Sequence, residues 1–374
     1  MLHTAIQKLS KLQDNHQFFM DPTSPKDLSS RARLDLRCIF PSSLPPCKKK
    51  IALFNLACWG LTKIAPNTLS SCGLESVSQM DALVDISGYG FGDCWPVSRH
   101  QAMFKRAKNY WRRSKPVLLL PQMFGPFEEP YRRNIFLKTS EFCTKIYARE
   151  QASYDWLERI GVPEEKLGMA PDITIFCNPD IGNWQSPAKG EYACLVPNMR
   201  MLEQTDWGDR YIDMMVTAGK YLREKGLEVF IVLHESGKGD TELARTIKVK
   251  LDDKANVFHH EDAQVLKKFI GESELLIGSR YHSIVAALSQ SVPALVMGWA
   301  HKYEELMADF GMFDFILDDN QNVEVITNKL SELLIPEKSE QVRTRLKNAK
   351  DNMQQENETM WEEVFKQLDK TYPL

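Results

Sequence analysis

The segment 275–306 limits the fold of this chain more than any other. Its first part, 275–277, is a short apolar run with the length of a buried strand, and Gly278 ends that run. The apolar residues of 283–288 then recur with helical spacing, and a second apolar run follows at 294–297. A strand, a turn, a helix and a strand in this order predict half of a doubly wound parallel sheet, in which ligands bind beyond the carboxyl ends of the strands.

The turn of this segment contains Arg280, Tyr281, His282 and Ser283, where the predicted helix begins. The first turn of a helix offers unpaired N–H groups and the positive end of the helix dipole, so it favours an anion. The planar guanidinium of Arg280 can bind a carboxylate or a phosphate through two hydrogen bonds, and His282 can donate or accept a proton near neutral pH. The same residues also suit an Arg paired with an acid and a His at a helix cap, so this motif alone leaves the function open.

Strands alternate with helices along both halves of the chain, which predicts an α/β protein with two Rossmann-like doubly wound domains. The first domain is predicted to span 1–182 and the second 190–335, with a linker near 178–190. Residues 336–374 contain the apolar spacing of an amphipathic helix, which we expect to pack back toward the first domain. The strands predicted in the first half are 51–56, 81–86, 116–120 and 145–148.

Glycines and polar residues follow several of the predicted strands. The glycine-rich turn 87–93 follows one strand of the first half, and a loop at 121–126 follows the next. We predict that six residues in such positions face a ligand cleft, although ordinary loop structure accounts for each equally well. They are Gly88, Gln122 and Gly125 in the first half and Asn198, Arg200 and His234 in the second.

The composition makes some classes of protein improbable. A net charge of −3 over 374 residues gives no reason to expect nucleic-acid binding. The eight cysteines include no C-x-x-C pair, which argues against a zinc site or a disulfide framework and favours free thiols in a reducing compartment. The N-terminal segment lacks the apolar core of a signal peptide, and no apolar run has the length of a membrane span. We therefore expect a cytoplasmic protein.

Basic residues are concentrated at 105–115, around Tyr110 and Trp111. Such a cluster is most often the solvated face of a helix. The alternative is peripheral contact with an anionic membrane or with a lipid-linked substrate.

Five short motifs follow one another in order over roughly two thirds of the chain. They are DALVDISGYG at 81–90, LLLPQMFGPF at 118–127, YAREQAS at 147–153, PDIT at 171–174 and GSRYHSIVAAL at 278–288, and Lys302 follows the next predicted strand. Together they resemble the polysaccharide pyruvyl transferase family. The resemblance implies two Rossmann-like domains arranged as in the GT-B glycosyltransferases. It also implies transfer of a pyruvyl group from phosphoenolpyruvate to sugar hydroxyls, commonly as a cyclic ketal, with release of phosphate.

The start of the chain departs from the family pattern. Family members usually begin with a strand and a G-N-x-G-D-like loop, followed by a complete strand–helix unit. Here Asn55, in the predicted strand 51–56, is followed by Leu-Ala-Cys-Trp-Gly. We therefore expect a shortened or rebuilt first domain, which the resemblance makes the acceptor side, and a phosphoenolpyruvate site in the second domain.

Pyruvyl transfer requires cations for the donor's carboxylate and phosphate, a proton donor, and a base for the sugar hydroxyl. The resemblance makes His282 the candidate acid, unless it only hydrogen-bonds phosphate. Asp93 or Asp85 could be the base, but each also suits a turn or a cap. The residues expected to bind substrate are Arg280, Arg149, Lys302, Tyr281 and Ser283, together with the six strand-end residues.

Two other functions stay open. A nucleotide-sugar glycosyltransferase of the GT-B type would share the architecture and would place Glu304 or Glu305 against a ribose. A non-catalytic protein that binds a glycan or an anion would keep the fold without the N-terminal loop. We expect no cofactor and no metal. The expected partners are phosphoenolpyruvate and a sugar or lipid-linked glycan, and nucleic acid is not among them.

Overall fold

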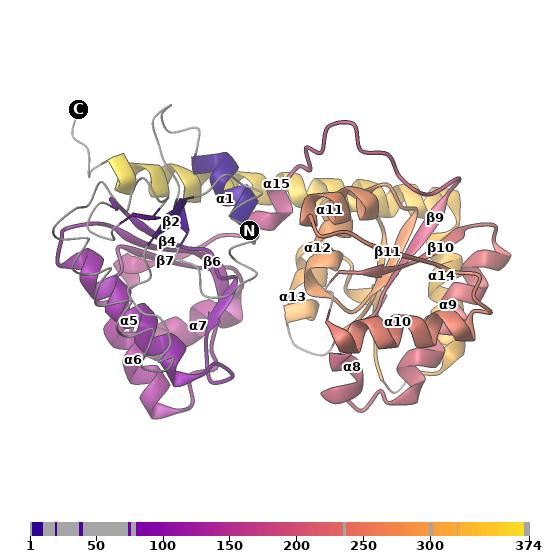
Figure 1. Cartoon of the computed structure of the whole chain (residues 1–374), viewed down its shortest axis with the longest axis horizontal. Helices are drawn as coiled ribbons and strands as arrows, with labels where there is room; N and C mark the ends of the chain where they lie inside the picture. Colours follow the sequence, from indigo (N-terminus) through magenta and orange to yellow (C-terminus); the bar gives the residue numbers. More distant parts are fainter. Residues whose placement is uncertain are drawn as a thin grey trace. The chain divides into compact units, whose positions relative to one another are not determined.

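The structure is a computed structural model that describes residues 2–9, 19–20, 37–39, 74–75, 80–234, 237–298, 302–319 and 321–369. The chain divides into two compact units (Figure 1). The N-terminal unit contains Met1–Ile173 and Glu356–Leu374, and the C-terminal unit contains Thr174–Gln355. The predicted strand 51–56, with Asn55, lies outside the described residues.

The C-terminal unit is built on a six-stranded parallel sheet. Its strands are β9 (Tyr192–Val196), β10 (Glu228–Leu233), β11 (Asn256–His259), β12 (Leu275–Gly278), β13 (Ala294–Met297) and β14 (Ile316–Leu317). They lie in the order β11-β10-β9-β12-β13-β14, and every pair is parallel. This is the 3-2-1-4-5-6 order of the Rossmann fold. The predicted doubly wound sheet is therefore confirmed.

Helices on both faces explain why the central strands of this unit are continuous apolar runs. The helices are α8 (Arg200–Glu203), α9 (Asp209–Glu224), α10 (Lys238–Lys250), α11 (Ala263–Gly271), α12 (Tyr281–Leu288), α13 (Lys302–Asp309) and α14 (Val323–Leu333), with the 3-10 helix η4 (Phe313–Phe315). Helix α9 contacts α10 and α14, whereas α11 contacts α12 on the other side of the sheet (Figure 1). Every residue of β9, β12 and β13 is buried, as expected for strands covered on both faces.

The N-terminal unit also has a parallel sheet with helices between its strands. The strands are β4 (Leu83–Asp85), β5 (Tyr89–Phe91), β6 (Val117–Phe124), β7 (Lys145–Ala148) and β8 (Leu167–Met169), and the helices are α5 (Val97–Trp111), α6 (Pro130–Ser140) and α7 (Gln151–Arg159). The strand order is β4-β6-β7-β8, and β5 pairs with the end of β6. Three short strands, β1 (Phe19–Met20), β2 (Arg37–Ile39) and β3 (Leu74–Glu75), form a separate parallel sheet. Other described elements of this unit are α1 (Leu2–Leu9) and η2 (Glu164–Lys166), and η3 (Ile173–Phe176) begins at its last residue before the C-terminal unit.

Strand β6 corrects two of the sequence predictions. The strand was expected to end at residue 120, but it continues through Pro121 to Phe124 because β5 pairs with its last two residues. For the same reason Tyr89–Phe91, expected to be part of a turn, is a strand. The pairing of β6 with β7 shifts register between Leu119 and Gln122. That irregularity includes Pro121, which has no N–H to donate to a neighbouring strand.

The C-terminal helix α15 (Pro336–Asp369) is 34 residues long and contributes to the cores of both units. Its first part belongs to the C-terminal unit, in whose core Leu346 is fully buried. From Glu356 onward it belongs to the N-terminal unit, where Trp361 is buried in a cluster with residues of α1, β6 and β7. The Tyr147 hydroxyl donates a hydrogen bond of 2.7 Å to the Glu363 carboxylate in the same unit.

Each unit has a buried cysteine in or next to its parallel sheet. Cys143 precedes β7 in the N-terminal unit, and Cys194 lies in β9 of the C-terminal unit. Burial raises the pKa of each thiol to about 12. Both are therefore thiols, not reactive thiolates, at neutral pH.

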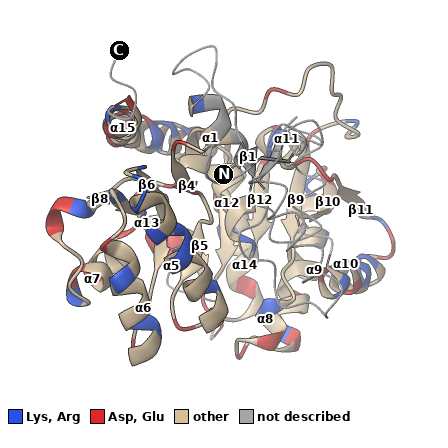
Figure 2. Cartoon of the chain, turned by 60° about the vertical axis from the view of Figure 1, so that its left-hand side comes forward, with Lys and Arg blue, Asp and Glu red and all other residues tan. Residues whose placement is uncertain are grey.

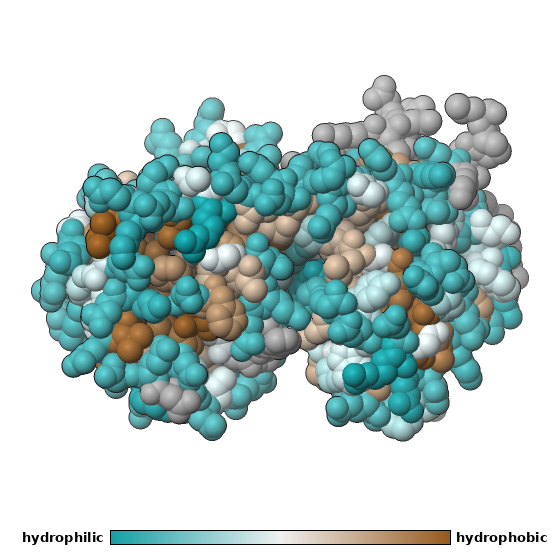
Figure 3. Space-filling view, turned by 180° about the vertical axis from the view of Figure 1, so that it is seen from behind, coloured by the Kyte–Doolittle hydropathy of each residue, from teal (hydrophilic) through white to brown (hydrophobic). Residues whose placement is uncertain are grey.

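The outer surface of each unit is mainly hydrophilic on the face that Figure 3 shows, and hydrophobic side chains reach that face in small groups. Within the described ranges, no helix combines the length and the apolar character needed to cross a bilayer.

The end of α15 provides a test of how the N-terminal unit is stabilised. We expect Trp361→Ala to lower the free energy of unfolding of this unit by about 3–5 kcal/mol, because it removes a large buried ring and leaves a cavity. Glu362→Ala, at the exposed neighbouring position, should change it by less than about 0.5 kcal/mol. Urea denaturation of the full chain measures both. Equal effects of the two substitutions would show that the helix end contributes little to this core.

Candidate functional site

The carboxyl ends of β9 and β12 form the point at which the C-terminal sheet changes direction, and this is where Rossmann folds bind ligands. Buried hydrogen bonds join the two loops there. The Asn198 side-chain amide donates to the Ser279 carbonyl over 2.8 Å. The Tyr211 hydroxyl accepts from the Asn198 backbone N–H and donates to Ser279 Oγ, both over 3.0 Å. The Tyr303 hydroxyl donates to the same Ser279 carbonyl over 2.9 Å. These hydrogen bonds hold the two loops together.

Arg280 is held at this point by an acid that the sequence analysis missed. Its guanidinium forms an ion pair with Asp240 of α10, whose side chain is only 3% exposed. The other oxygen of Asp240 accepts the backbone N–H of Met199 over 2.8 Å. The carboxylate thus fixes the guanidinium and the loop after β9 at the same time. About a fifth of the Arg280 side chain, 19%, stays exposed to solvent.

Four of the predicted residues form a group of rings and a cation beside Arg280. The rings of His234 and His282 stack with centroids 6.4 Å apart, and the Tyr281 ring meets His282 edge-on at 5.6 Å. Lys302 Nζ lies 5.4 Å from the centroid of the Tyr281 ring. His282 is exposed, whereas Tyr281 and Lys302 are half-buried. The structure therefore brings Arg280, Lys302 and two imidazoles together at the start of α12.

Three further predicted residues of this unit differ in whether their side chains are buried or accessible to a ligand. Ser283 is fully buried, and its Oγ donates to the Arg280 carbonyl over 2.7 Å. The Asn198 side chain is also buried and accepts the Arg200 backbone N–H over 3.1 Å. These two residues position the loops in this structure. The side chain of Arg200, at the start of α8, is exposed.

In the N-terminal unit, Asp85 and Gln122 lie side by side at the ends of β4 and β6. The Gln122 amide donates to Asp85 Oδ1 over 2.9 Å. Ser87 Oγ lies 2.7 Å from the same Asp85 oxygen and 2.9 Å from Gln122 Oε1. Gly88, which follows, has a φ of +71°, and its carbonyl accepts the Met123 N–H over 2.9 Å. Within this group Ser87 is exposed, Asp85 is half-buried and Gln122 is fully buried.

Arg149, predicted to bind the donor, lies in a buried cluster with two acids. Its guanidinium contacts Glu150 at 2.8 Å and Asp172 at 3.2 Å, and its side chain is 4% exposed. The guanidinium of Arg149 is therefore engaged by two carboxylates. The prediction that Arg149 and Arg280 bind one anion involves both units and stays a prediction.

Asp93 and Gly125 fasten the loops after β5 and β6 to each other. Asp93 Oδ2 accepts the backbone N–H groups of Glu128 and Glu129 over 2.7 and 3.2 Å. Its Oδ1 is buried and has no hydrogen-bond partner within the described part of the chain. Gly125 has a φ of +86°, and a Cβ there would lie 2.7 Å from the Trp156 ring, so only glycine fits. The role of Asp93 as a base stays a prediction, since one of its two oxygens is already engaged.

His100 supports the same loop from beneath. It is 1% exposed on α5, and its Nε2 lies 3.2 Å from the Gly92 carbonyl oxygen. Burial lowers the pKa of His100, and the nearby guanidinium groups of Arg132 and Arg99 lower it further. The imidazole is therefore neutral at pH 7 and donates its Nε2 proton to Gly92.

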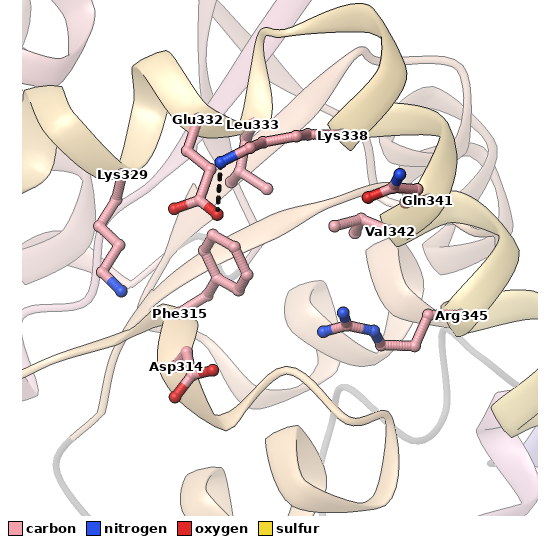
Figure 4. Close-up of a pocket in the computed structure, with 9 residues that line it drawn as sticks. All are labelled: Asp314, Phe315, Lys329, Glu332, Leu333, Lys338, Gln341, Val342 and Arg345. Carbon is pink, nitrogen blue, oxygen red and sulfur yellow. Dashed lines mark hydrogen bonds and ion pairs between the residues drawn. The ribbon is translucent and has the colours of Figure 1, made fainter.

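A pocket of about 230 Å³ in the C-terminal unit lies away from these residues (Figure 4). Its floor includes Phe315, which directly precedes β14 and so marks the amino end of the sheet. The remaining lining residues come from η4, α14 and α15 and are Asp314, Lys329, Glu332, Leu333, Lys338, Gln341, Val342 and Arg345. None of the predicted site residues lines this pocket.

The described residues contain no group of three or more His, Cys, Asp or Glu side chains placed to hold a metal ion. At the end of β12 the polar groups include Arg280, Lys302 and two histidines, which suit an anionic organic ligand, whereas the strand ends of the N-terminal unit also carry Asp85 and Asp93.

Comparison with known structures defines the class of fold. The UDP-GlcNAc 2-epimerase from Neisseria meningitidis bound to UDP-GlcNAc matches with a TM-score of 0.57 at 11% identity, over 95% of this chain and 96% of that chain. The UDP-GlcNAc 2-epimerase from Methanocaldococcus jannaschii matches with a TM-score of 0.56 at 13% identity, over 89% of each chain. At such identities the likeness concerns the fold alone. The predicted class, two Rossmann-like domains of the GT-B-like type, is confirmed.

The sequence then identifies the family within that class. The family described as polysaccharide pyruvyl transferase matches residues 1–301. The chain belongs to the polysaccharide pyruvyl transferase family, which confirms the resemblance inferred from the five motifs.

The neutral His100 makes the stability of the N-terminal unit depend on pH. In the unfolded chain its pKa is about 6.5, so below that pH the unfolded state binds a proton that the folded state resists. The contribution of the neutral His100 to the free energy of unfolding is therefore fully present above about pH 6.5. It is lost as the pH falls from there toward the lowered pKa of His100 in the folded state. We expect His100→Gln, whose amide can still donate to Gly92, to show a smaller loss of melting temperature between about pH 7.5 and 5.5 than the parent.

The matched control is His259→Gln, which replaces an exposed histidine of the C-terminal unit. It should lose melting temperature by as much as the parent over the same range. A parent-like loss in His100→Gln would show that His100 does not carry this pH dependence.

Proposed function

We propose that this protein transfers a pyruvyl group from phosphoenolpyruvate to hydroxyl groups of a glycan and releases phosphate. Membership of the polysaccharide pyruvyl transferase family supports a pyruvyl transfer to a glycan. The observation that carries the choice of donor is the cationic group at the end of β12. There Arg280, Lys302 and the start of α12 offer cations and N–H groups to one small polyanion.

The proposed reaction has two additions to the same carbon. Protonation of the methylene carbon of phosphoenolpyruvate leaves an oxocarbenium-like centre at the neighbouring carbon. A sugar hydroxyl adds to that centre and gives up its proton to a base. The C–O bond to phosphate then breaks, and a second sugar hydroxyl adds to the same carbon and loses its proton to close the ketal. The site must therefore bind an anion, supply one proton and remove the hydroxyl protons.

In this proposal Arg280 binds the carboxylate or phosphate of the donor in the orientation that Asp240 imposes. Lys302 adds a second positive charge, and Tyr281 keeps it close by presenting its ring to the ammonium group. His282 is the candidate acid. A bound dianion favours the imidazolium form, so His282 would take up its proton when the donor binds. His234, stacked on His282, would hold that ring in place.

The N-terminal unit is proposed to bind the acceptor glycan. Asp85 or Asp93 would remove a hydroxyl proton, and Gln122 would orient Asp85 through their hydrogen bond. Arg149 would contribute to donor binding only by sharing its guanidinium with Glu150 and Asp172. A cytoplasmic location and a sugar or lipid-linked acceptor complete the proposal. The chemistry as written needs no cofactor and no metal.

Two measurements test this function. Phosphate release from phosphoenolpyruvate should depend on a glycan acceptor, and a panel of glycans should identify it. A ligand that binds only the folded state raises the melting temperature, so phosphoenolpyruvate should raise it more than UDP or GDP does. Stabilisation by a nucleotide and not by phosphoenolpyruvate would replace the proposal with the nucleotide-sugar glycosyltransferase. Binding of phosphoenolpyruvate without phosphate release on any glycan would favour a non-catalytic anion-binding protein.

His282→Gln separates proton transfer from binding. We expect the variant to fold normally and to bind the donor nearly as well, because the amide can still donate a hydrogen bond to phosphate. Turnover should fall about a hundred-fold or more, the size of a lost general acid. If turnover stays near that of the parent while donor affinity drops, His282 is a phosphate ligand and the acid is another group.

Arg280→Lys separates charge from geometry. A lysine keeps the positive charge but cannot reproduce a planar fork that contacts Asp240 and the donor together. We expect donor affinity to fall about ten- to hundred-fold, the range for a charged hydrogen bond lost. Arg245→Lys, on the exposed side of α10, is the control and should bind phosphoenolpyruvate like the parent. Isothermal titration measures both, and equal affinities would remove Arg280 from the donor site.

A further inference from the structure

Two neighbouring helices of the N-terminal unit carry a strong excess of positive charge. Residues 97–115, which include α5, contain seven Lys and Arg, and α6 contains three. Neither segment contains an Asp or Glu. The rest of the chain then has 37 Lys and Arg against all 50 Asp and Glu. The positive charge is thus local, on a protein whose net charge is −3.

The structure places the two helices side by side and in the same direction. Near their starts, the Gln101 amide donates to the Tyr131 hydroxyl over 3.1 Å. At their ends, the rings of Trp111 and Phe142 lie 5.3 Å apart. The buried residues of α5, including Met103, Ala107 and Tyr110, belong to the core of the unit. Lys105, Arg112, Arg113 and Lys138 are exposed, and Figure 2 shows Lys and Arg along both α5 and α6.

A large aromatic ring lies among these charges at the carboxyl ends of the helices. Trp111 is 54% exposed, and its ring packs against the half-buried Phe142. Lys108 Nζ lies 5.6 Å from the centroid of Phe104 and 5.8 Å from that of Phe142. We define the basic face as Trp111 with five cations of α5, the residues just after it, and α6: Lys105, Lys108, Arg112, Arg113 and Lys138.

Ion pairs with acids of the described residues do not compensate the charges of the basic face. No salt bridge joins any of its five cations to an acid among the described residues. The ion pairs of the two segments involve other residues, such as Lys115 with Asp81 and Arg132 with Glu129. Glu141, exposed just after α6, is the acid closest to the basic face in sequence. Cations also complement the dipole at the carboxyl end of a helix, but that effect does not account for an exposed tryptophan.

We propose that the basic face docks this protein on the surface of an anionic phospholipid bilayer. Phosphate and carboxylate headgroups would neutralise the five cations, and Trp111 would lie at the headgroup level, where amphipathic rings are favoured. Phe104 and Phe142 extend the apolar surface beneath Trp111. This contact is peripheral and does not depend on the donor or acceptor that the enzyme uses.

Vesicle sedimentation with the full-length chain tests the proposal. The protein should sediment with vesicles of phosphatidylcholine containing about a third phosphatidylglycerol and remain soluble with phosphatidylcholine alone. Each lysine or arginine near an anionic surface strengthens binding several-fold. The double substitution Arg112→Glu and Arg113→Glu should therefore weaken the partition coefficient about ten-fold or more. Raising the NaCl concentration from about 0.1 to 0.5 M should weaken it similarly because salt screens the charges.

A matched pair of exposed aromatic substitutions tests the tryptophan separately. Trp111→Ala should weaken partitioning by about five-fold, while Phe313→Ala, an equally exposed ring of the C-terminal unit, should leave it unchanged. Lipids brominated near the headgroup should quench part of the fluorescence of the parent, and this part should vanish in Trp111→Ala. Lys248→Glu with Lys250→Glu on α10 is the control for charge reversal. Thermal melting of each variant verifies that it is folded.

Three results would overturn the proposal. The first is a parent protein that does not sediment with anionic vesicles at about 0.1 M salt. The second is equal weakening by the substitutions on α5 and on α10, which would indicate an effect of net charge. The third is a protein that ignores vesicles but binds single-stranded nucleic acid through Trp111 and the arginines, which would assign the basic face to a different partner.

Discussion

The hydrogen bond from Asn198 to the Ser279 carbonyl joins the ends of the two strands at which the C-terminal sheet reverses its order. The remainder of the site depends on this contact. A sheet covered by helices on both faces buries almost every side chain it carries, so polar chemistry is confined to the ends of its strands. Tyr211 and Tyr303 add their hydroxyls to the same junction, and each is itself fully or nearly fully buried. The loops that carry the predicted site residues are therefore attached to a fully buried hydrogen-bonded junction.

The two arginines expected to bind the donor have different surroundings. Arg280 pairs with the buried carboxylate of Asp240 and keeps part of its side chain open to solvent. Arg149 is almost completely buried and contacts two carboxylates. Removing one partner from a buried ion pair leaves an uncompensated charge, which destabilises a protein strongly. Loss of activity on substituting Arg149 would therefore reflect folding as well as binding, whereas Arg280 is a clearer probe of the ligand.

The features that could be predicted from the sequence are those that depend on neighbouring residues in the chain. The apolar runs at 275–277 and 294–297 match β12 and β13 almost residue for residue. Strands that are buried on both faces have continuous apolar sequences, so their positions can be predicted. The end of β6 could not be predicted, since its pairing with β5 depends on residues more than 30 positions away. Asp240 was missed for a related reason. An acid in the first turn of a helix is common at the surface, and only the fold places this one against Arg280.

The buried thiols Cys143 and Cys194 allow the opening of the two units to be measured separately. Each lies in a different unit, and each has its pKa raised to about 12 by burial, so neither is alkylated at neutral pH while its unit is closed. A maleimide or iodoacetamide reagent would reach Cys143 when the N-terminal sheet opens and Cys194 when the C-terminal sheet opens. Peptide mapping of the two sites over time would then give the opening kinetics of each unit separately within one intact chain, without any engineered cysteine.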